Sequence, residues 1–213
     1  MLLQAALVFS VFHRRIAWRY PGFAVLIVFY PLRATLLFLL SGHAAADTSA
    51  AWSDVLSVAE ILLEGWLVVE LAFRLTTESG ARTRTWSGAS IIIAALVGAG
   101  VTLTVAPSRV PVDRTQVFFW WAMLALGAAA VFLLPPQKRS TNLIQLCGGF
   151  AVFSLCQLMA LAGRAHAFAE RSRQEYVGWS YVPAVAYIFV VMCWLVFLRK
   201  EPLRERKSPG ASA

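Results

Sequence analysis

The chain has 213 residues, of which 59% are hydrophobic and 14% charged, and its mean hydropathy is +0.67. Soluble domains carry nearer a quarter charged residues, so this composition excludes a soluble globular protein and places most of the chain in a lipid bilayer. The formal net charge of +8 does not indicate a nucleic-acid partner, because nearly all basic residues lie in short segments between apolar runs or in the C-terminal tail.

Seven apolar runs follow one another, and each predicts a helix. The first, Met1–Phe12, is shorter than the ~20 residues of a typical spanning helix. It lacks the basic start and the cleavage site of a signal peptide, so we expect a short first helix. The remaining runs are Tyr20–Leu40, Trp52–Leu75, Trp86–Ala106, 116–134, Thr141–Gly163 and Val177–Leu198. Two longer outer loops are expected, Ser41–Ala51 and Arg164–Tyr176.

These runs predict an all-α, polytopic membrane protein with seven transmembrane helices in one domain, residues 1–198. The segment 199–213 is basic and contains Pro and Gly, so we expect a disordered cytoplasmic tail. With the N-terminus outside, thirteen of the 19 Lys and Arg residues lie on the cytoplasmic side and five outside, while Arg33 lies within the membrane. Cytoplasmic loops carry an excess of Lys and Arg, which favours an N-out/C-in orientation in a bacterial-type inner membrane.

The third run, Trp52–Leu75, organises the predicted bundle because it is long enough to cross a bilayer yet contains acidic residues. On a helix, Glu60, Glu64 and Glu70 fall within an arc of roughly 120°. The opposite side is apolar and has the character of a lipid-facing surface: Val55, Val58, Ile61, Leu62, Trp66, Val69 and Phe73. Carboxylates at membrane depth are costly, so the acidic side must face other helices or a wet cavity.

Depth along the helices predicts a partner for one of these carboxylates. Arg33 and Glu60 each lie about eight residues from the outer ends of neighbouring antiparallel runs, which places both ~12 Å below the outer surface at 1.5 Å per residue. We therefore predict an ion pair between them. Glu64, one turn deeper, has no second arginine at its level, and we expect it to be protonated or to hydrogen-bond to Tyr30, Tyr187 or water.

Two interpretations of these groups stay open. Together with Gln157 and Ser154 of the same outer half, they would form a polar site that opens to the outside and holds a small ligand or passes a proton. In the other interpretation the ion pair only holds two helices together. Glu70 is different, because it precedes Arg74 by four residues near the cytoplasmic surface, and this spacing predicts a structural ion pair.

Neither a metal site nor a cofactor is predicted. The pairs His43/Asp47 and His166/Glu170 have helical spacing but lie in expected loops that nothing fixes together. The three cysteines, Cys147, Cys156 and Cys193, are expected to be packed thiols within apolar runs. The sequence contains no hydrolase nucleophile motif, zinc-protease motif or phosphate-binding loop, and the last run lacks the buried lysine of retinal proteins. We therefore predict no enzymatic activity.

Two resemblances are visible. Tyr20-Pro21-Gly22-Phe23 at the entry to the second run, with the glutamates of the third, resembles uncharacterised bacterial seven-span integral membrane proteins. That resemblance implies the fold over most of the chain and no known activity. Pro135-Pro136-Gln137 resembles the motif of PQ-loop and sugar-efflux carriers, but the matching region of the first repeat, residues 13–22, has no Pro-Gln. This second likeness covers one loop.

The sequence thus favours a non-enzymatic membrane module that binds a small ligand or a partner protein, in sensing or as a complex subunit. Its expected partners are the lipid bilayer and a membrane or cytoplasmic protein, with acidic lipid near the basic tail. The alternative is a small-solute or proton-coupled transporter that uses Arg33, Glu60 and Glu64. A carrier needs access from both faces and broken helices in symmetric halves. Pro31 and Pro183 fit this, but the halves show no repeat. An embedded enzyme is the third possibility.

Overall fold

The computed structural model describes residues 2–43, 46–79, 97–99, 102, 114–132 and 141–199, and it leaves out the side chains of residues 41–43, 46–50, 78–79 and 114. Every element in this part of the chain is a helix: α1 (Leu2–His13), α2 (Ile16–Arg19), α3 (Pro21–His43), α4 (Ala46–Ser79), α6 (Arg114–Phe132), α7 (Thr141–Ala169) and α8 (Arg173–Phe197). Most of the predicted fourth run, Trp86–Ala106, and the tail beyond Arg199 lie outside the described residues.

Four of the described helices are long and apolar enough to cross a membrane, namely α3 over Pro21–Leu40, α6 over Thr115–Phe132, α7 and α8. The all-α fold and the length and composition of these apolar helices are consistent with a membrane protein. Helix α1 is apolar but only 12 residues long. Helix α4 has 34 residues, and Glu60, Glu64 and Glu70 form an acidic stripe along one side of it. This helix can lie in a membrane only if its other, apolar side contacts the lipid.

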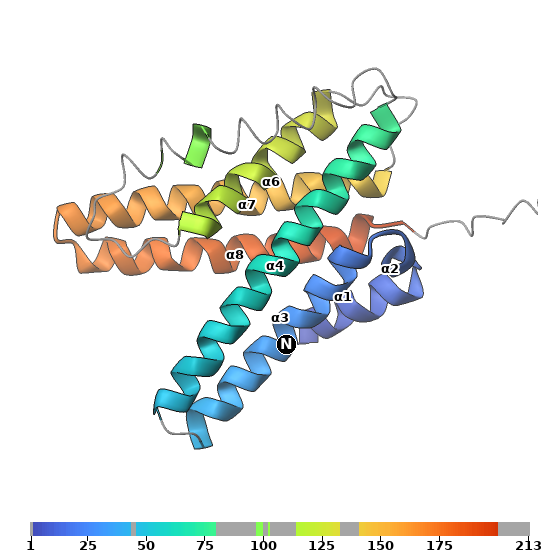
Figure 1. The fold of residues 1–213 in the computed structure, drawn as a ribbon. Helices are drawn as coiled ribbons and strands as arrows, with labels where there is room; N and C mark the ends of the chain where they lie inside the picture. Colours follow the sequence, from blue (N-terminus) through green and yellow to red (C-terminus); the bar gives the residue numbers. More distant parts are fainter. Residues whose placement is uncertain are drawn as a thin grey trace, which may run out of the picture.

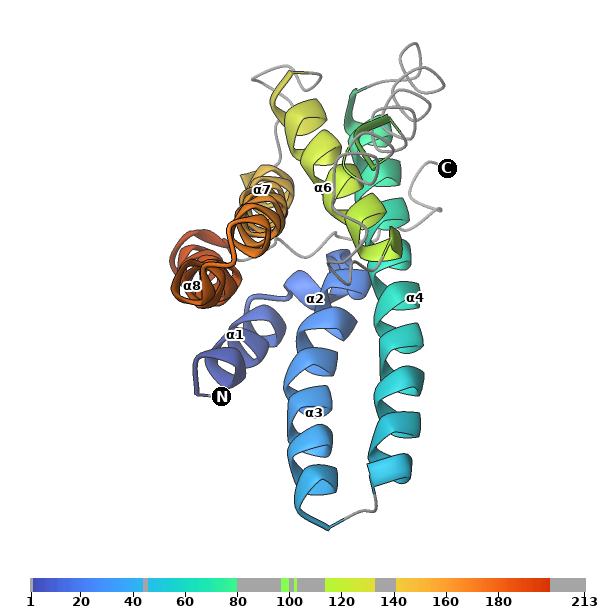
Figure 2. The same cartoon turned by 90° about the vertical axis from the view of Figure 1, so that its left-hand side faces the viewer.

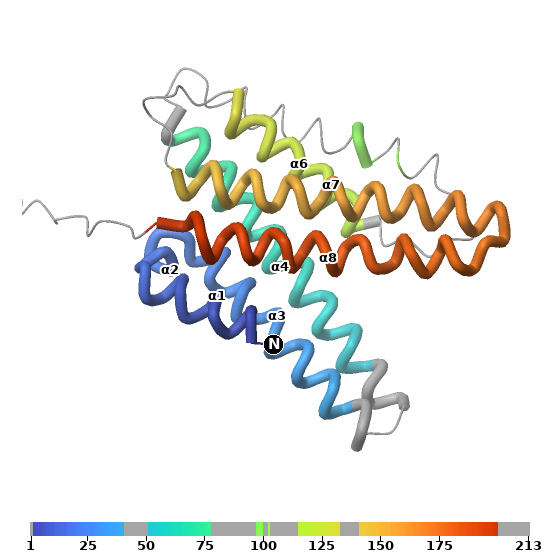
Figure 3. Tube along the Cα trace, turned by 180° about the vertical axis from the view of Figure 1, so that it is seen from behind, coloured from blue at the N-terminus to red at the C-terminus, as the bar shows by residue number. Residues whose placement is uncertain are grey.

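Two helix hairpins dominate the arrangement. Helices α3 and α4 lie side by side, as do α7 and α8, and the two pairs diverge from the end where α4 and α8 finish (Figures 1 and 3). Helix α6 packs on α4 and α7, while α1 packs on α3 and α8, so these two helices connect the pairs (Figure 2). The two pairs therefore converge at one end of the bundle, the closed end, where α4 and α8 finish.

The two sides of α4 differ in burial as the sequence predicts. Its inward side carries three fully buried leucines, Leu67, Leu71 and Leu75, and Glu60 is buried on the same helix. Of the seven apolar residues expected to face lipid, all but the half-buried Ile61 are exposed large hydrophobic side chains. An exposed apolar face this long is unfavourable in water and favourable against lipid.

At the closed end, Glu70 connects α4 to the start of α3. The predicted ion pair is present, with Arg74 Nη2 3.3 Å from Glu70 Oε1. The other carboxylate oxygen accepts a hydrogen bond from the backbone N–H of Gly22 at 2.7 Å. A carboxylate at a helix N-terminus satisfies a free N–H group and interacts favourably with the helix dipole. The Arg74 guanidinium in turn lies 4.8 Å from the ring centroid of the buried Tyr20.

Hydrogen bonds hold the C-terminus of α8 at the same end of the bundle. Asn142 makes two hydrogen bonds to the backbone of Arg199, one to its carbonyl and one from its N–H, both at 2.8 Å. Arg14 donates to the carbonyl of Leu198, and Trp194 Nε1 donates to the carbonyl of Gln145 at 3.0 Å. The contacts to Leu198 and Arg199 satisfy carbonyls that follow the end of α8, and the Trp194 contact joins α8 to the first turns of α7.

The predicted extent of both outer loops is wrong. Most of Arg164–Tyr176 is helical, since α7 continues to Ala169 and α8 begins at Arg173. Arg171 turns the chain with a left-handed φ of 57°, and the Ser172 N–H closes the end of α7 on the Ala167 carbonyl at 2.9 Å. Residues 41–43 and 46–50 of the other predicted loop are helical too. Bilayer thickness limits the apolar part of a helix, but it does not stop the helix from continuing into the polar interface.

Candidate functional site

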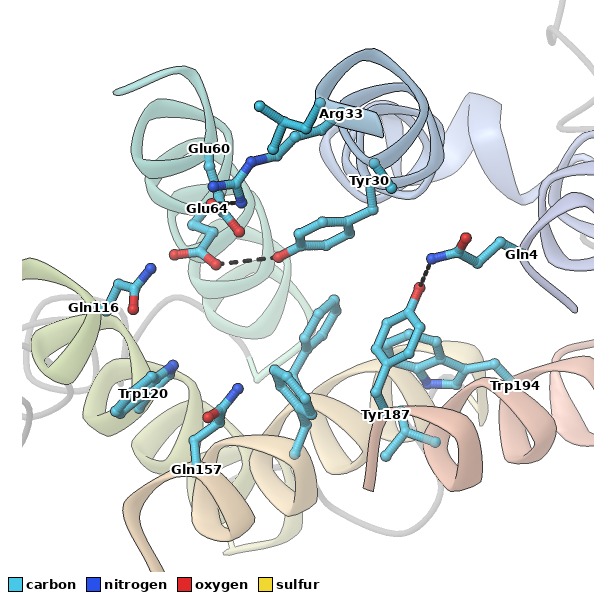
Figure 4. Close-up of a pocket in the computed structure, with 15 residues that line it drawn as sticks. Gln4, Tyr30, Arg33, Glu60, Glu64, Gln116, Trp120, Gln157, Tyr187 and Trp194 are labelled. Carbon is cyan, nitrogen blue, oxygen red and sulfur yellow. Dashed lines mark hydrogen bonds and ion pairs between the residues drawn. The ribbon is translucent and has the colours of Figure 1, made fainter. Parts of the chain in front are cut away.

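A pocket of about 410 Å³ lies between the two hairpins (Figure 4). Side chains from α1, α3, α4, α6, α7 and α8 line it: Gln4, Tyr30, Arg33, Ala34, Leu37, Glu60, Glu64, Gln116, Trp120, Phe150, Phe153, Gln157, Tyr187, Val190 and Trp194. Six helices, from α1 near the start of the chain to α8 near its end, thus contribute to one cavity. Its volume is within the range of small-molecule sites in proteins.

All six residues that the sequence analysis grouped as a ligand or proton site line this pocket, and they come from four helices: Tyr30 and Arg33 from α3, Glu60 and Glu64 from α4, Gln157 from α7, and Tyr187 from α8. Ser154, which was expected beside them, is buried but is not among the lining residues. Glu70 and Arg74 lie outside the pocket and hold the hairpin, as described above.

The Arg33–Glu60 ion pair is present. Arg33 Nη1 donates to Glu60 Oε2, and Arg33 Nη2 donates to Ser57 Oγ at 3.3 Å. The Arg33 side chain is 24% exposed and that of Glu60 10%, so both charges are largely removed from solvent. An unpaired charge at this depth would be strongly unfavourable, and the pair removes most of that penalty.

Glu64 interacts with a tyrosine, one of the partners expected for it. The Tyr30 hydroxyl donates to Glu64 Oε1 at 3.2 Å. Tyr187, the other tyrosine considered, instead accepts a hydrogen bond from Gln4 Nε2 at 3.1 Å. The two tyrosine rings lie 6.4 Å apart in an edge-to-face arrangement, and Figure 4 shows their hydroxyl groups pointing to different partners, Glu64 and Gln4.

Aromatic side chains form the opposite wall. The Phe150 ring lies 4.8 Å from that of Trp194, and the Phe153 ring lies 6.1 Å from that of Tyr187. The hydrogen bond of its indole N–H fixes the orientation of Trp194. Gly149 allows this packing, because a Cβ there would lie 2.5 Å from the indole nitrogen. The wall therefore presents aromatic carbon to the polar residues of α3 and α4.

Sequence reasoning missed several lining residues. Gln4 had one available signal, since it is one of two polar residues in the first apolar run. Gln116 and Trp120 lie one turn apart near the start of α6, where their type also suits a membrane interface (Figure 4). Phe150 and Trp194 carried no signal, because an aromatic residue in an apolar run is equally suited to lipid and to a cavity.

The one predicted loop pair whose side chains the structure describes, His166/Glu170, does not join the pocket. His166 Nε2 lies 3.1 Å from Glu170 Oε1, with both side chains more than half exposed, beyond the described pocket lining. The side chains of His43 and Asp47 are among those that the structure leaves out. Among the residues that were described, no group of three or more His, Cys, Asp and Glu side chains could hold a metal ion.

No protein family model, curated protein or solved structure matches this chain. The pocket is therefore the main basis for a functional assignment.

Proposed function

We propose that the protein is a non-enzymatic inner-membrane module, with seven spans in an N-out/C-in orientation, that binds a small molecule between its helix hairpins, in sensing or as a subunit of a membrane complex. The observation that carries this proposal is the pocket of about 410 Å³. It is lined by all six residues that were expected to form a polar site. Residues 1–198 form the bundle, and the basic tail contacts acidic lipid or a cytoplasmic protein.

The pocket favours ligand binding over a purely structural ion pair. Protein interiors are packed with few voids larger than a water molecule. An ion pair that only joined α3 to α4 would need no cavity beside it, yet Arg33 and Glu60 border one. Polar side chains from α1, α6, α7 and α8 converge on the same space. A mostly apolar cavity with a few convergent polar groups is the usual form of a small-molecule site.

The distribution of apolar and acidic residues on α4 supports counting this helix as a span, in addition to the four apolar helices. Its exposed apolar side faces away from the pocket, and its carboxylates at positions 60 and 64 line the pocket. This division allows a helix with several charges to cross a bilayer.

Reporter fusions at Ala46 and Ala213 test the orientation: the first should be active outside the membrane and the second in the cytoplasm. A fusion at Ala213 that is active outside would refute the proposed topology.

A compound screen tests the binding function. The purified chain in detergent is screened for small molecules that raise its thermal unfolding temperature. We expect such compounds, and we expect Ala34→Trp to abolish their effect because residue 34 lines the pocket. The matched control is Ala184→Trp on the exposed side of α8, away from the pocket lining, which should leave the effect intact. Compounds that act equally on both variants would place binding elsewhere.

Proton-coupled transport is a second candidate, and the Glu64–Tyr30 contact beside the Arg33–Glu60 pair favours it. Ionisable groups at membrane depth commonly mark ion or proton pathways. Proteoliposomes containing a pH-sensitive dye would show acidification driven by a proton gradient if the protein conducts or couples protons. A Glu64→Gln variant should abolish that signal in a transporter, whereas a binding module should give none in either form.

A further inference from the structure

We propose that the ligand of this pocket is a small organic cation carrying a tertiary or quaternary ammonium group. This inference rests on the proposed ligand-binding function and specifies its chemical class. It follows from two independent properties of the lining, its charge and its aromatic content.

The charge of the lining is the first property. Among the described residues, the lining contains two carboxylic side chains, Glu60 and Glu64, and one basic side chain, Arg33. Arg33 is in direct contact with Glu60, so these two charges largely compensate each other. With all three groups ionised, the described part of the lining carries one net negative charge. An anionic ligand would have to approach two carboxylates, whereas a cation would balance the net charge in a largely dehydrated site.

Glu64 is well placed to make this interaction. Glu64 lies one helical turn from Glu60. Its carboxyl group accepts a hydrogen bond from the Tyr30 hydroxyl, whereas Arg33 contacts Glu60 (Figure 4). The hydrogen bond from Tyr30 holds this carboxyl group in place in the cavity. A cationic ligand group could therefore pair with a carboxyl group of fixed position.

The aromatic content of the lining is the second property. Six aromatic residues line the pocket: Tyr30, Trp120, Phe150, Phe153, Tyr187 and Trp194. The faces of aromatic rings attract cations, tryptophan most strongly, and sites lined by several rings are suited to quaternary ammonium groups. Substituted ammonium groups are bulky and weakly hydrated, so they leave water more easily than a lysine-like primary amine. The amides of Gln4, Gln116 and Gln157 remain to bind a polar group elsewhere on the ligand.

Three probes of matched shape test the class of ligand. Choline, 3,3-dimethylbutan-1-ol and 3,3-dimethylbutanoate share a branched apolar head and differ in charge, being cationic, neutral and anionic. Benzyltrimethylammonium serves as a larger cation. Binding to the full chain in detergent is measured by titration calorimetry and by tryptophan fluorescence. We expect the two cations to bind and the neutral and anionic probes to bind at least about tenfold more weakly.

Two variants assign the charge effect to the pocket. Glu64→Gln keeps the shape of the side chain and an acceptor for Tyr30, and it should weaken cation binding about tenfold. Asp54→Asn removes a carboxylate from the same helix at an exposed position outside the pocket lining, and it should leave binding unchanged. Equal loss in both variants would indicate a general surface-charge effect and would refute the assignment.

The outcomes separate this inference from the proposed function. Equal or tighter binding of the neutral or anionic probe refutes the cation class but leaves a ligand pocket in place. No binding of either cation at millimolar concentration refutes the cation class as well. In that case the compound screen with Ala34→Trp decides separately whether the pocket binds any small molecule.

Discussion

The Arg33–Glu60 pair gives the sharpest quantitative test of the structure, through a double-mutant cycle. Removing one partner of a buried ion pair leaves an uncompensated charge and typically costs 3–5 kcal/mol, so we expect a loss of about 3 kcal/mol for Arg33→Leu or Glu60→Leu because Arg33 is partly exposed. The double variant leaves no unpaired charge. It should therefore be more stable than the sum of the single losses predicts, with a coupling energy of about 3 kcal/mol.

The order of the single variants is also predicted. Glu60→Gln can still accept a hydrogen bond from Arg33, so it should lose less stability than Glu60→Leu. Arg33→Leu should lose less than Glu60→Leu as well, because an unpaired glutamate can take up a proton whereas an arginine keeps its charge. Free energies of unfolding are measured in mixed detergent micelles.

The protein contains its own control for this cycle. His166 and Glu170 lie 3.1 Å apart, but both side chains are more than half exposed. Solvent screens such pairs, so the same cycle there should give a coupling energy below about 0.5 kcal/mol. Additive losses for Arg33→Leu and Glu60→Leu would show that the two residues do not interact. The ion pair that joins α3 to α4 in the pocket would then be refuted.

Further predictions concern the closed end of the bundle. Gly22→Ala should destabilise the protein by about 1–2 kcal/mol, because the added Cβ would lie 2.7 Å from Glu70 Oε2. Gly178→Ala is the matched control, since its Cβ would meet nothing within 4 Å, and it should stabilise helix α8 by up to about 1 kcal/mol. Asn142→Ala removes both hydrogen bonds to the Arg199 backbone and should cost about 1–3 kcal/mol, visible as faster amide hydrogen exchange at the end of α8.

The central contacts were predictable because a few physical quantities determine them. A fixed rise per residue and antiparallel neighbours bring Arg33 and Glu60 to one depth, and a fixed rotation per residue separates the glutamates from the apolar side of α4. The penalty for a charge in lipid then gives the direction in which each side must face. Charge and helical geometry thus carried the prediction for α3 and α4.

The rest of the pocket depended on information that a sequence pattern does not contain. Gln4 reaches Tyr187 only because α1 packs against α8, two helices at opposite ends of the chain. Phe150 and Trp194 face each other because Gly149 lets the indole approach, which is a property of packing and not of periodicity. The predicted length of the loop that begins at Arg164 was too great for a related reason. The length of an apolar run reflects the thickness of the bilayer, whereas the helix can continue beyond it.

The acidic stripe of α4 performs two different tasks, and substitutions should separate them. Glu70 accepts a hydrogen bond from the Gly22 N–H and pairs with Arg74, so Glu70→Gln should lower stability, by about 1–2 kcal/mol, while the affinity of the pocket for choline stays the same. Glu64 lines the cavity and accepts a hydrogen bond from Tyr30, which a glutamine at this position could still accept, so Glu64→Gln should lower affinity with little change in unfolding free energy. The two residues lie on the same helix and undergo the same chemical change, which makes each a control for the other. If both variants lost stability and affinity together, the stripe would act as one structural unit, and the division between a fastening at the closed end and a binding site between the hairpins would be wrong.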